Sequence, residues 1–332
     1  MATVGIKDVA QRAGVSPGTV SNVLNRPERV AATTRARVEQ AIRELGFVRN
    51  GSASTLRAGQ SRAVGLVVLD VGNPFFVEVA RGVEDVVSDR DHAVILCNSG
   101  ESPEKEARNL RVLAEQRVRG VLITPAGDDT SGLARLRERG VAVVLVDHSA
   151  SGDVCSVAVD DVAGGELAVR HLIENGARRL AFVSGSKAIR QCSDRRRGAL
   201  RALETSGPSP GDLTDVVVPE MNAHGGQVAA RTLLDEGLPD AVFCANDLLA
   251  LGVLRVLLQA GVRVPEDVAL IGYDDIEFSS AAAVPLSSIR QPTYQLGKIA
   301  TELLLEECDD PAGHAHQQIM FQPELVVRES SG

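Results

Sequence analysis

The N-terminal part of the chain carries two short apolar stripes with a helical period. One stripe consists of Ile6, Val9, Ala10 and Ala13, and the other of Val20, Val23 and Leu24. This spacing places side chains on one face of a helix. Gly14 favours a left-handed helix end, and Ser16 followed by Pro17 is typical of the start of a new helix. The pattern predicts a helix-turn-helix, and a plain helical hairpin in a small bundle is the alternative.

A third helix of about twelve residues is expected to complete this N-terminal domain. Thr33 is a suitable N-cap and Gly46 a suitable stop, and the buried stripe between them would be Val38, Ala41, Ile42 and Leu45. The Gly, Ser and Thr residues between Asn50 and Gly59 have the composition of a linker. Leu56 in this stretch is either a linker residue that packs on a neighbouring domain or a wedge between base steps of a DNA minor groove.

From Ala63 onward, short apolar runs alternate with longer amphipathic segments. The predicted strands are Val64–Leu69, Ala93–Cys97, Gly120–Thr124, Ala142–Val146, Leu180–Ser184, Val216–Val218, Ala241–Cys244 and Val268–Gly272. The predicted helices include Phe75–Arg90, Glu104–Gln116, Val162–Asn175, Ala223–Glu236 and Leu248–Ala260. This alternation predicts parallel sheets covered by helices on both faces. The pattern restarts near Asp160, which indicates two similar lobes with a ligand cleft between their strand ends.

The charge of the chain is divided unevenly along its length. The formal net charge is −9, but residues 1–62 contain ten Lys or Arg and four Asp or Glu, a net charge of +6. The remaining residues therefore carry −15. A basic head on an acidic body favours an N-terminal nucleic-acid module.

The composition also bears on the compartment. The chain has no apolar run long enough to span a bilayer and no signal-peptide pattern at its start. Its five cysteines are scattered without a CxxC pair, which is typical of reduced thiols. We therefore expect a cytoplasmic protein without a membrane partner.

Polar side chains cluster at the ends of the predicted strands. The candidates there are Asn73 with Phe75 and Phe76, Asp147 with His148, Asp160 with Asp161, Arg195, Asn246 and Asp274. Carboxylates, amides and an Arg beside Phe rings suit a polyhydroxylated ligand, because rings supply apolar contact and paired donors and acceptors discriminate hydroxyls. Asp160, Asp161 and Asn246 also begin predicted helices, so a role in stabilising helix ends is the alternative.

Motifs of catalysis are missing from the sequence. There is no P-loop, no GxGxxG loop and no GxSxG elbow, so we expect neither an enzyme nor a bound cofactor. His314 and His316 are spaced to place two imidazoles on one strand face, as a metal pair. Because no third ligand is evident nearby, we expect a solvated tail and no metal site.

Taken together, the motifs resemble the lactose-repressor (LacI) family of bacterial transcription regulators, from about Val4 to Ser331. The motifs that carry the resemblance are IKDVAQRAGVSPGTVS, NPFF, ANDLLALG, GVRVPEDVALIGYDD, PLSSIRQP and PELVVRESS. The second part of the chain is similar to periplasmic sugar-binding proteins. A sugar-binding protein without a regulatory role is therefore the rival interpretation, and the helix-turn-helix head argues against it.

The resemblance implies an α/β fold in three parts. These are an N-terminal three-helix helix-turn-helix DNA-binding domain (1–49), a hinge helix and linker (50–62), and a two-lobed periplasmic-binding-protein-like doubly wound α/β domain for effector binding and dimerisation (63–332). Lobe one would comprise about 63–160 and 292–320, and lobe two about 161–291 and 321–332. The resemblance further implies a homodimer on a pseudo-palindromic operator.

The candidate DNA-binding residues lie in the head and the linker. They are Ser16, Pro17, Gly18, Thr19, Ser21, Asn22, Asn25, Arg29, Thr34, Arg49, Asn50 and Leu56. By resemblance, Pro17, Gly18 and Asn22 would face the bases and Leu56 would be the hinge wedge. Asn22 stands where the family commonly has Arg, so we predict that it reads an A·T pair. Gly5 replaces the usual Thr or Ser cap of the first helix, and Arg49 replaces the usual Pro.

For the effector, the resemblance places one set of residues in the cleft. The set is Asn73, Phe75, Phe76, Asp147, His148, Arg195, Asn246, Asp274 and Gln291. His148 stands where Arg is common and Asp161 where Asn is usual, a change that would disfavour an acidic ligand. A sugar or related metabolite is the expected effector, and a nucleobase, a nucleoside or a partner protein is the alternative. Induction and corepression both remain open.

Overall fold

The computed structural model describes residues 4–47, 61–127, 129, 131–150, 152–206 and 211–332. The chain divides into two compact units, Met1–Ser61 and Arg62–Gly332. The predicted DNA-binding residues Arg49, Asn50 and Leu56 lie outside the described residues. None of the described helices is both long enough and apolar enough to cross a membrane.

The small unit contains the predicted helix-turn-helix. Its elements are α1 (Ile6–Ala13), α2 (Pro17–Asn25), a 3₁₀ turn (Pro27–Arg29) and α3 (Ala32–Leu45). Gly14 ends α1 in the left-handed conformation with φ 63°. Val9, Val20 and Val38, one from each α-helix, are completely buried and form the centre of the small core.

The predicted cap of the third helix was wrong. Ala31 is the N-cap of α3, and Thr33 lies inside the first turn. The backbone N–H groups of Thr34 and Arg35 both donate to the carbonyl of Ala31, so the turn closes before Thr33. The weak cap expected at Gly5 is supported from within α1, because the Gly5 N–H donates to Asp8 Oδ2 at 2.7 Å.

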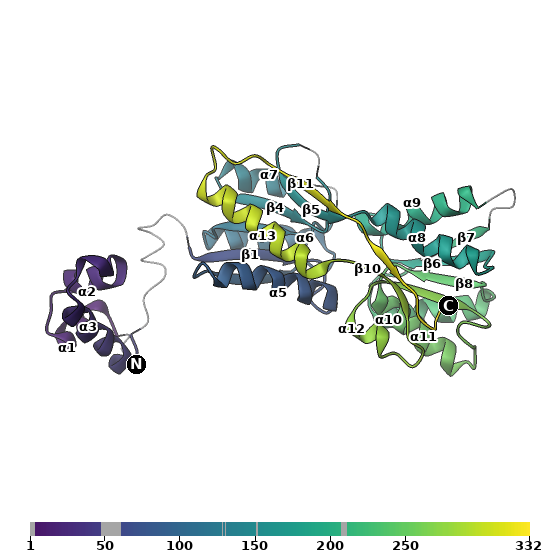
Figure 1. Ribbon diagram of the computed structural model, residues 1–332, viewed down its shortest axis with the longest axis horizontal. Helices are drawn as coiled ribbons and strands as arrows, with labels where there is room; N and C mark the ends of the chain where they lie inside the picture. The colour runs from purple at the N-terminus through teal and green to yellow at the C-terminus, as the bar shows by residue number, and fades with distance from the viewer. Residues whose placement is uncertain (1–3, 48–60, 128, 130, 151, 207–210) are drawn as a thin grey trace. The chain divides into compact units, whose positions relative to one another are not determined.

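The first lobe of the large unit is built on a parallel sheet with the strand order β11-β5-β4-β3-β1-β2 (Figure 1). Its strands are β1 (Ala63–Val68), β2 (Ala93–Asn98), β3 (Gly120–Ile123), β4 (Ala142–Val146), β5 (Cys155–Val159) and β11 (Gln318–Phe321). Its helices are α5 (Pro74–Ser88), α6 (Pro103–Glu115), α7 (Ser131–Glu138) and α13 (Thr293–Asp309). α5 and α13 pack against each other on one face of the sheet, and α6 and α7 cover the other.

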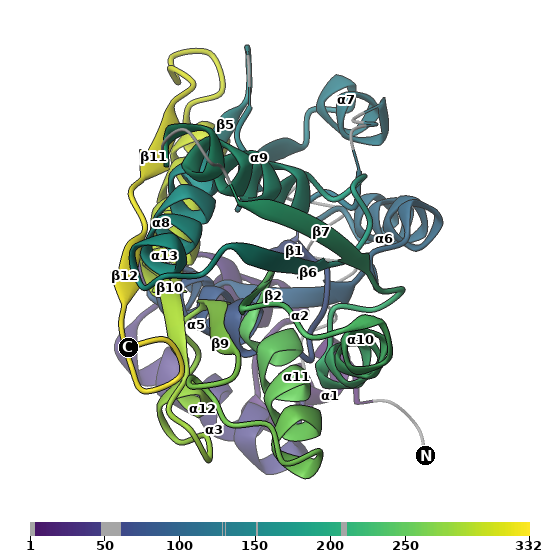
Figure 2. The same ribbon diagram turned by 90° about the vertical axis from the view of Figure 1, so that its right-hand side faces the viewer.

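The second lobe has the strand order β12-β10-β9-β8-β6-β7. Its strands are β6 (Arg179–Ser184), β7 (Asp212–Val217), β8 (Ala241–Cys244), β9 (Ala269–Asp274), β10 (Ser287–Arg290) and β12 (Glu324–Val326). Its helices are α8 (Asp161–Glu174), α9 (Arg190–Thr205), α10 (Ala223–Glu236), α11 (Asp247–Gln259) and α12 (Glu277–Ser280). Figure 2 shows α8 and α9 on one side of this sheet and α10 and α11 on the other.

The sheets differ from the prediction in a few places. The edge strand β12 runs antiparallel to β10, so the second sheet is not wholly parallel. β7 spans Asp212–Val217 rather than Val216–Val218, because its polar residues pair along the whole length of β6. The chain passes between the lobes three times, from β5 to α8, from β10 to α13 and from β11 to β12. These crossings bring the carboxyl ends of the strands in both lobes to a shared cleft.

Candidate functional site

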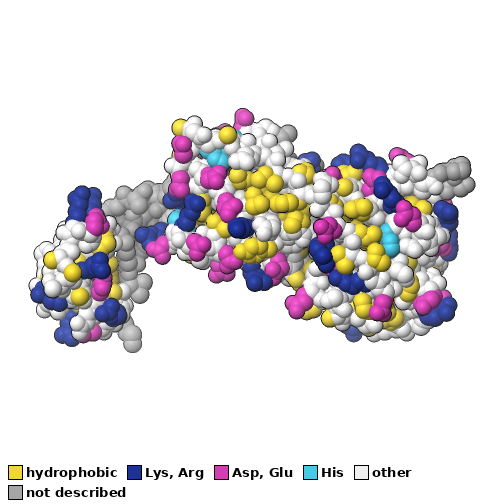
Figure 3. Space-filling model, viewed as in Figure 1, with side chains coloured by type: hydrophobic (Ala, Val, Ile, Leu, Met, Phe, Trp, Pro, Cys, Tyr) yellow, Lys and Arg dark blue, Asp and Glu magenta, His cyan; other side chains and the backbone are white. Residues whose placement is uncertain are grey.

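The outer face of α2 is the candidate DNA-reading surface. Pro17, Gly18 and Asn22 are exposed there, while Val20 and Val23 are buried beneath them. A Cβ added at Gly18 would meet nothing closer than Ser16 Oγ, 3.6 Å away, so this face has room for a side chain. Lys and Arg side chains are distributed over the small unit (Figure 3), which provides the positive charge that phosphates attract.

Some polar side chains around this face already form hydrogen bonds within the small unit, and others do not. Ser16 Oγ accepts a hydrogen bond from the Thr19 N–H at 3.1 Å and lies 2.9 Å from Thr19 Oγ1. Asn25 Nδ2 donates to the Ser21 carbonyl at 2.7 Å. The Asn22 carbonyl accepts from the Arg26 N–H, but its side-chain amide has no hydrogen bond among the residues that the structure describes, so the amide is available to a base edge. Arg29 is exposed and Thr34 half-buried on the same small unit.

Arg195 lies at the centre of the cleft in the large unit. It comes from α9, is 6% exposed, and donates from Nε to Asp161 Oδ1 at 2.8 Å and from Nη1 to the Ala245 carbonyl at 2.5 Å. Its guanidinium carbon lies 3.6 Å from the ring centroid of Tyr273, a stacked arrangement that fixes the plane of the group. The side chain is thus held in one orientation by the second lobe alone.

Asp274 joins the two lobes. It ends β9 in the second lobe and accepts hydrogen bonds from Gln291 Nε2 at 2.8 Å and from Asn73 Nδ2 at 3.2 Å. Asn73 belongs to the first lobe, where it also caps α5 by accepting from the Phe75 N–H. Asp274 has a φ of 109°, a conformation that is costly for a residue with a Cβ and that clusters at functional sites.

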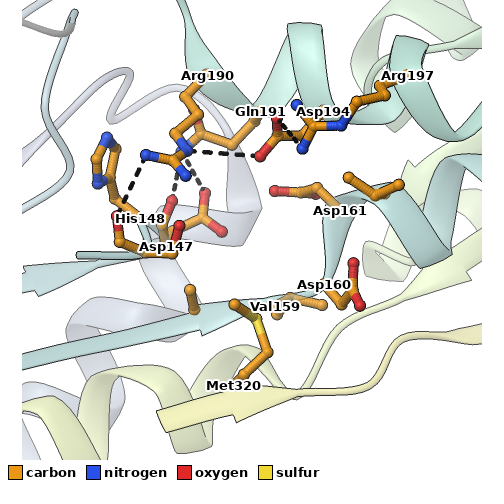
Figure 4. A pocket seen from close by; sticks show the side chains of 13 residues that line it. Asp147, His148, Val159, Asp160, Asp161, Arg190, Gln191, Asp194, Arg197 and Met320 are labelled. Atoms are coloured by element: carbon orange, nitrogen blue, oxygen red, sulfur yellow. Dashed lines mark hydrogen bonds and ion pairs between the residues drawn. The ribbon is translucent and has the colours of Figure 1, made fainter. Parts of the chain in front are cut away.

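Asp147 makes the second link between the lobes. It follows β4 in the first lobe with a φ of 52°, and Gln191 from α9 donates to its carbonyl at 2.6 Å and to its Oδ2 at 3.0 Å. Asp147 and His148 face Arg190 and Gln191 around a cavity of about 160 Å³ (Figure 4). The cleft is therefore closed in this structure by hydrogen bonds across it.

Most of the predicted effector residues line one inner cavity of about 40 Å³. They are Asn73, Phe75, Phe76, Asp147, Arg195, Asn246 and Asp274. The rings of Phe75 and Phe76 meet edge to face with centroids 5.0 Å apart. Ile189 and Met221 connect this space to an outer chamber of about 370 Å³, which is lined by Asp70, Glu101, Lys105 and Glu220, among others.

The carboxyl groups of the cleft resist ionisation. Burial raises the pKa of Asp274 to about 6, even though Arg195 and the two amides act against the shift. Burial, and then the neighbouring Asp161, raise the pKa of Asp147 well above its usual range. In the outer chamber, burial together with Asp70 and Glu220 raises the pKa of Glu101 to about 7. The cleft is thus a poor environment for further negative charge.

The other predicted cleft residues have additional or different contacts. Gln291 contacts Asp274 rather than lining the inner cavity, and His148 lines the neighbouring cavity. Asn246 lines the inner cavity, yet its side chain caps α11 at Leu249 N–H and donates to the Met221 carbonyl. Its helix-capping alternative is therefore present in the structure.

Sequence reasoning identified this site only in part. Asp161 was a candidate at a strand end, but its ion pair with Arg195 was not predicted. Gln191 and Tyr273 were not singled out, because an amide on a helix and an aromatic residue in a buried strand are common without function. The position of Gln191 one turn before Arg195 on α9 was the available signal.

Comparisons with known proteins agree with this architecture. Residues 5–50 match the family described as bacterial regulatory proteins, lacI family, and residues 169–331 match a periplasmic binding protein-like domain. The HTH-type transcriptional repressor PurR of Aliivibrio salmonicida is 36% identical over 334 residues, 98% of each chain. A transcriptional regulator CelR–cellobiose complex is 33% identical, with a TM-score of 0.72 over 98% of this chain and 99% of that one. The lac repressor dimer bound to operator and the anti-inducer ONPF is 28% identical, with a TM-score of 0.83 over 99% of both chains.

Proposed function

Because the chain belongs to the lacI family of bacterial regulatory proteins and is a DNA-binding regulator rather than an enzyme, we propose that it is a cytoplasmic repressor whose operator affinity is set by a neutral sugar bound in the cleft. The observation that carries the proposal is the pair of hydrogen bonds that close the cleft, Asn73 to Asp274 and Gln191 to Asp147. A ligand that changes the stability of this closed form changes the equilibrium between two conformations of the regulator.

The balance of charge in the cleft favours a neutral effector. In the inner cavity, Asp147 and Asp274 face one lining cation, Arg195, which is already paired with Asp161. A phosphate or carboxylate placed in the inner cavity would add an anion beside these buried carboxyl groups without gaining a free cation. Sugar hydroxyls can instead donate to the carboxylates while a pyranose face packs on Phe75 and Phe76.

The outer chamber extends the space for such a ligand. It has a volume of about 370 Å³ and opens next to the inner cavity at Ile189 and Met221. The inner cavity of about 40 Å³ must widen to admit one sugar ring, whereas the outer chamber has room for a second ring as it stands. The solved relative with cellobiose supports a disaccharide as the first probe.

A nucleobase is the second candidate effector. The curated relatives at 36% identity are repressors named PurR, and a neutral base also presents N–H donors to carboxylates and a flat face to Phe rings. The two candidates differ in size, since a free base would leave the outer chamber unfilled.

The proposed assembly is a homodimer on a pseudo-palindromic operator. The lac repressor relative is a dimer on its operator. Val77 on α5 and Phe278 on α12 are large apolar side chains that are 49% and 56% exposed, one on each lobe. Figure 3 shows hydrophobic side chains gathered over the first lobe near α13, with a further group on the second lobe. Two copies that bury such surfaces against each other would bring two DNA-reading units to one operator.

Thermal unfolding of the full-length protein with a panel of ligands tests the effector class. The panel contains neutral mono- and disaccharides, the corresponding sugar phosphates, and free nucleobases. A ligand at 100 times its Kd adds about 2.7 kcal/mol, which raises the Tm by about 5 °C or more in a unit of this size. We expect a neutral sugar to give this shift, and Asp274→Asn but not the exposed control Asp235→Asn to reduce it.

Each alternative result has a defined meaning. A shift with a nucleobase and none with sugars would replace the first candidate by the second. A shift only with phosphorylated sugars would contradict the charge argument. An equal shift in the Asp274→Asn variant and the wild type would place the ligand outside this cleft.

A further inference from the structure

Four potential metal ligands meet at the end of the first lobe that lies away from the cleft. Cys155 is the first residue of β5, Glu307 lies in the last turn of α13, and His314 and His316 precede β11. One donor atom from each lies within 4.8 Å of every other. The cleft lies at the carboxyl ends of the strands, whereas Cys155 marks the amino end of its strand, so the cluster is separate from the effector site.

The distances within this cluster match those between the ligands of one metal ion. His314 Nε2 lies 3.1 Å and His316 Nδ1 3.7 Å from Cys155 Sγ, and His316 Nδ1 lies 4.0 Å from Glu307 Oε2. In a tetrahedral zinc site the bond lengths separate neighbouring donor atoms by about 3.3–3.6 Å. Shifts of about 0.1–0.7 Å would therefore bring the three contacts to coordination geometry.

Glu307 provides an independent indication of a missing partner. Its Oε2 is shielded from solvent and has no hydrogen-bond partner among the residues that the structure describes. A buried carboxylate oxygen without a partner is costly. This oxygen lies within the same cluster as the thiol and the two imidazoles, so a cation placed there would satisfy it.

The surroundings of the thiol are also those of a metal ligand. The backbone N–H of Gln317 donates to Cys155 Sγ at 3.3 Å and acts against the rise in the thiol pKa that burial causes. The rings of His314 and His316 stand edge to face, 5.4 Å apart and inclined by 75°, so each can direct a nitrogen to a common point. The sequence analysis expected a solvated tail at His314 and His316 because no third ligand was evident, but both imidazoles are half-buried and lie beside Cys155 and Glu307. Cys155 was not recognised as a partner because it is separated from His316 by 161 positions.

We propose that Cys155, Glu307, His314 and His316 form a binding site for one Zn²⁺ ion. A thiolate and two imidazoles with one carboxylate select a borderline-soft cation over Mg²⁺ or Ca²⁺. Four protein ligands fill the tetrahedron and leave no open position for a substrate, so the site is structural or regulatory rather than catalytic.

The metal would join three segments of the first lobe. It would hold the end of α13 and the segment before β11 against the start of β5. β11 begins two residues after His316 and leads directly into the crossing to β12 in the second lobe. Bound zinc would thus fix the first-lobe end of one of the three connections between the lobes.

Metal analysis of the full-length protein tests the proposal. The metal-free, reduced protein is titrated with Co²⁺, and zinc affinity is measured by competition with a chromophoric chelator. We expect one metal per chain, tetrahedral Co²⁺ bands and a sulfur-to-cobalt charge-transfer band. Cys155→Ser should abolish the charge-transfer band, and Cys155→Ser, His314→Ala and Glu307→Gln should each weaken zinc binding more than tenfold.

Matched controls separate loss of ligands from loss of folding. Cys97→Ser, His224→Ala and Glu115→Gln change the same residue types outside the cluster and should keep the wild-type zinc affinity. Far-UV circular dichroism of each metal-free variant reports whether it is folded. Wild-type protein that binds less than one zinc, or Co²⁺ bound without a thiolate band, would overturn the proposal. So would a folded Cys155→Ser variant with the affinity of Cys97→Ser.

Discussion

The contact between α8 and α9 sets the position of the cleft residues on α9. A single methyl group added at this contact should push the two helices apart. Gly165 on α8 lies so close to α9 that an added Cβ would stand 2.0 Å from the Arg195 carbonyl oxygen and 2.9 Å from its Cα. Ordinary contact begins at 3.4 Å, so Gly165→Ala requires the helices to separate by about 1.4 Å. The neighbouring atoms are backbone and cannot turn aside.

The expected cost follows from two opposing effects. Overpacking of a close helix contact costs typically about 1–3 kcal/mol and occasionally more, and a backbone clash of this depth belongs at the upper end. Ala gains about 1 kcal/mol over Gly in helix propensity. We expect a net loss of about 2 kcal/mol, which lowers the Tm of the large unit by about 4–8 °C. The same shift of α9 would move Arg195 and Gln191 and weaken effector binding.

Urea and thermal unfolding followed by far-UV circular dichroism measure this loss. Gly132→Ala is the matched control, because it is also a helical Gly to Ala change but its Cβ meets only side-chain atoms at ordinary distances, Leu110 Cδ1 at 3.4 Å and Arg135 Nη2 at 3.9 Å. We expect the control to be neutral or slightly stabilising. Operator binding by the small unit should persist in both variants, since that unit is compact on its own. A Gly165→Ala protein as stable as the control, with unchanged effector affinity, would refute this account of the α8–α9 contact.

Four further predictions concern pH, the DNA-reading helix and the subunit contact. Burial, and then Asp274, raise the pKa of Asp247 to about 8, so the free energy of unfolding should decrease as the pH rises from 5 to 8. Asp247→Asn should flatten this pH dependence in urea titrations, and an unchanged slope in the variant would contradict the assignment. Ser16→Ala removes the cap of α2 and should destabilise the small unit by about 1 kcal/mol in thermal melts, whereas an unaltered melt would show that the cap contributes little. Asn22→Ala should relax operator preference at one A·T position in a binding-site selection, and an invariant G·C there would disprove the assignment. Val77→Asp should shift the protein toward monomer in light scattering, and an intact dimer would place the contact elsewhere.

The regular elements were largely predictable from local pattern. Apolar periodicity located α1, α2 and most of the strands, because each of these elements buries a face that the sequence repeats. The N-cap of α3 was missed because backbone hydrogen bonding to Ala31 outweighed the local preference for Thr33. The antiparallel edge strand β12 was missed because its direction is fixed by the crossing from β11 and not by its own residues.

The sequence predicted which residues line the candidate site better than it predicted the contacts among them. Strand ends and motif positions identified Asn73, Arg195 and Asp274, which line the same inner cavity. The links that close the cleft depend on residues far apart in the chain, such as Asn73 and Asp274, and no local pattern encodes them. The cluster around Cys155 was not predicted for the same reason, because its donor atoms come from β5, α13 and the segment before β11.

The route of the chain through the two lobes also decides when each part can fold during synthesis. The first lobe includes α13 and the edge strand β11, which are made only after every element of the second lobe except β12. Leu296, Ala300 and Leu304 of α13 are completely buried in the core that it shares with α5, so the first lobe lacks part of its interior until then. The small unit needs only its own three helices. On the ribosome, the small unit can therefore fold well before the large unit is complete. A chain that stalls after β10 would carry a folded DNA-binding unit and an incomplete effector-binding unit.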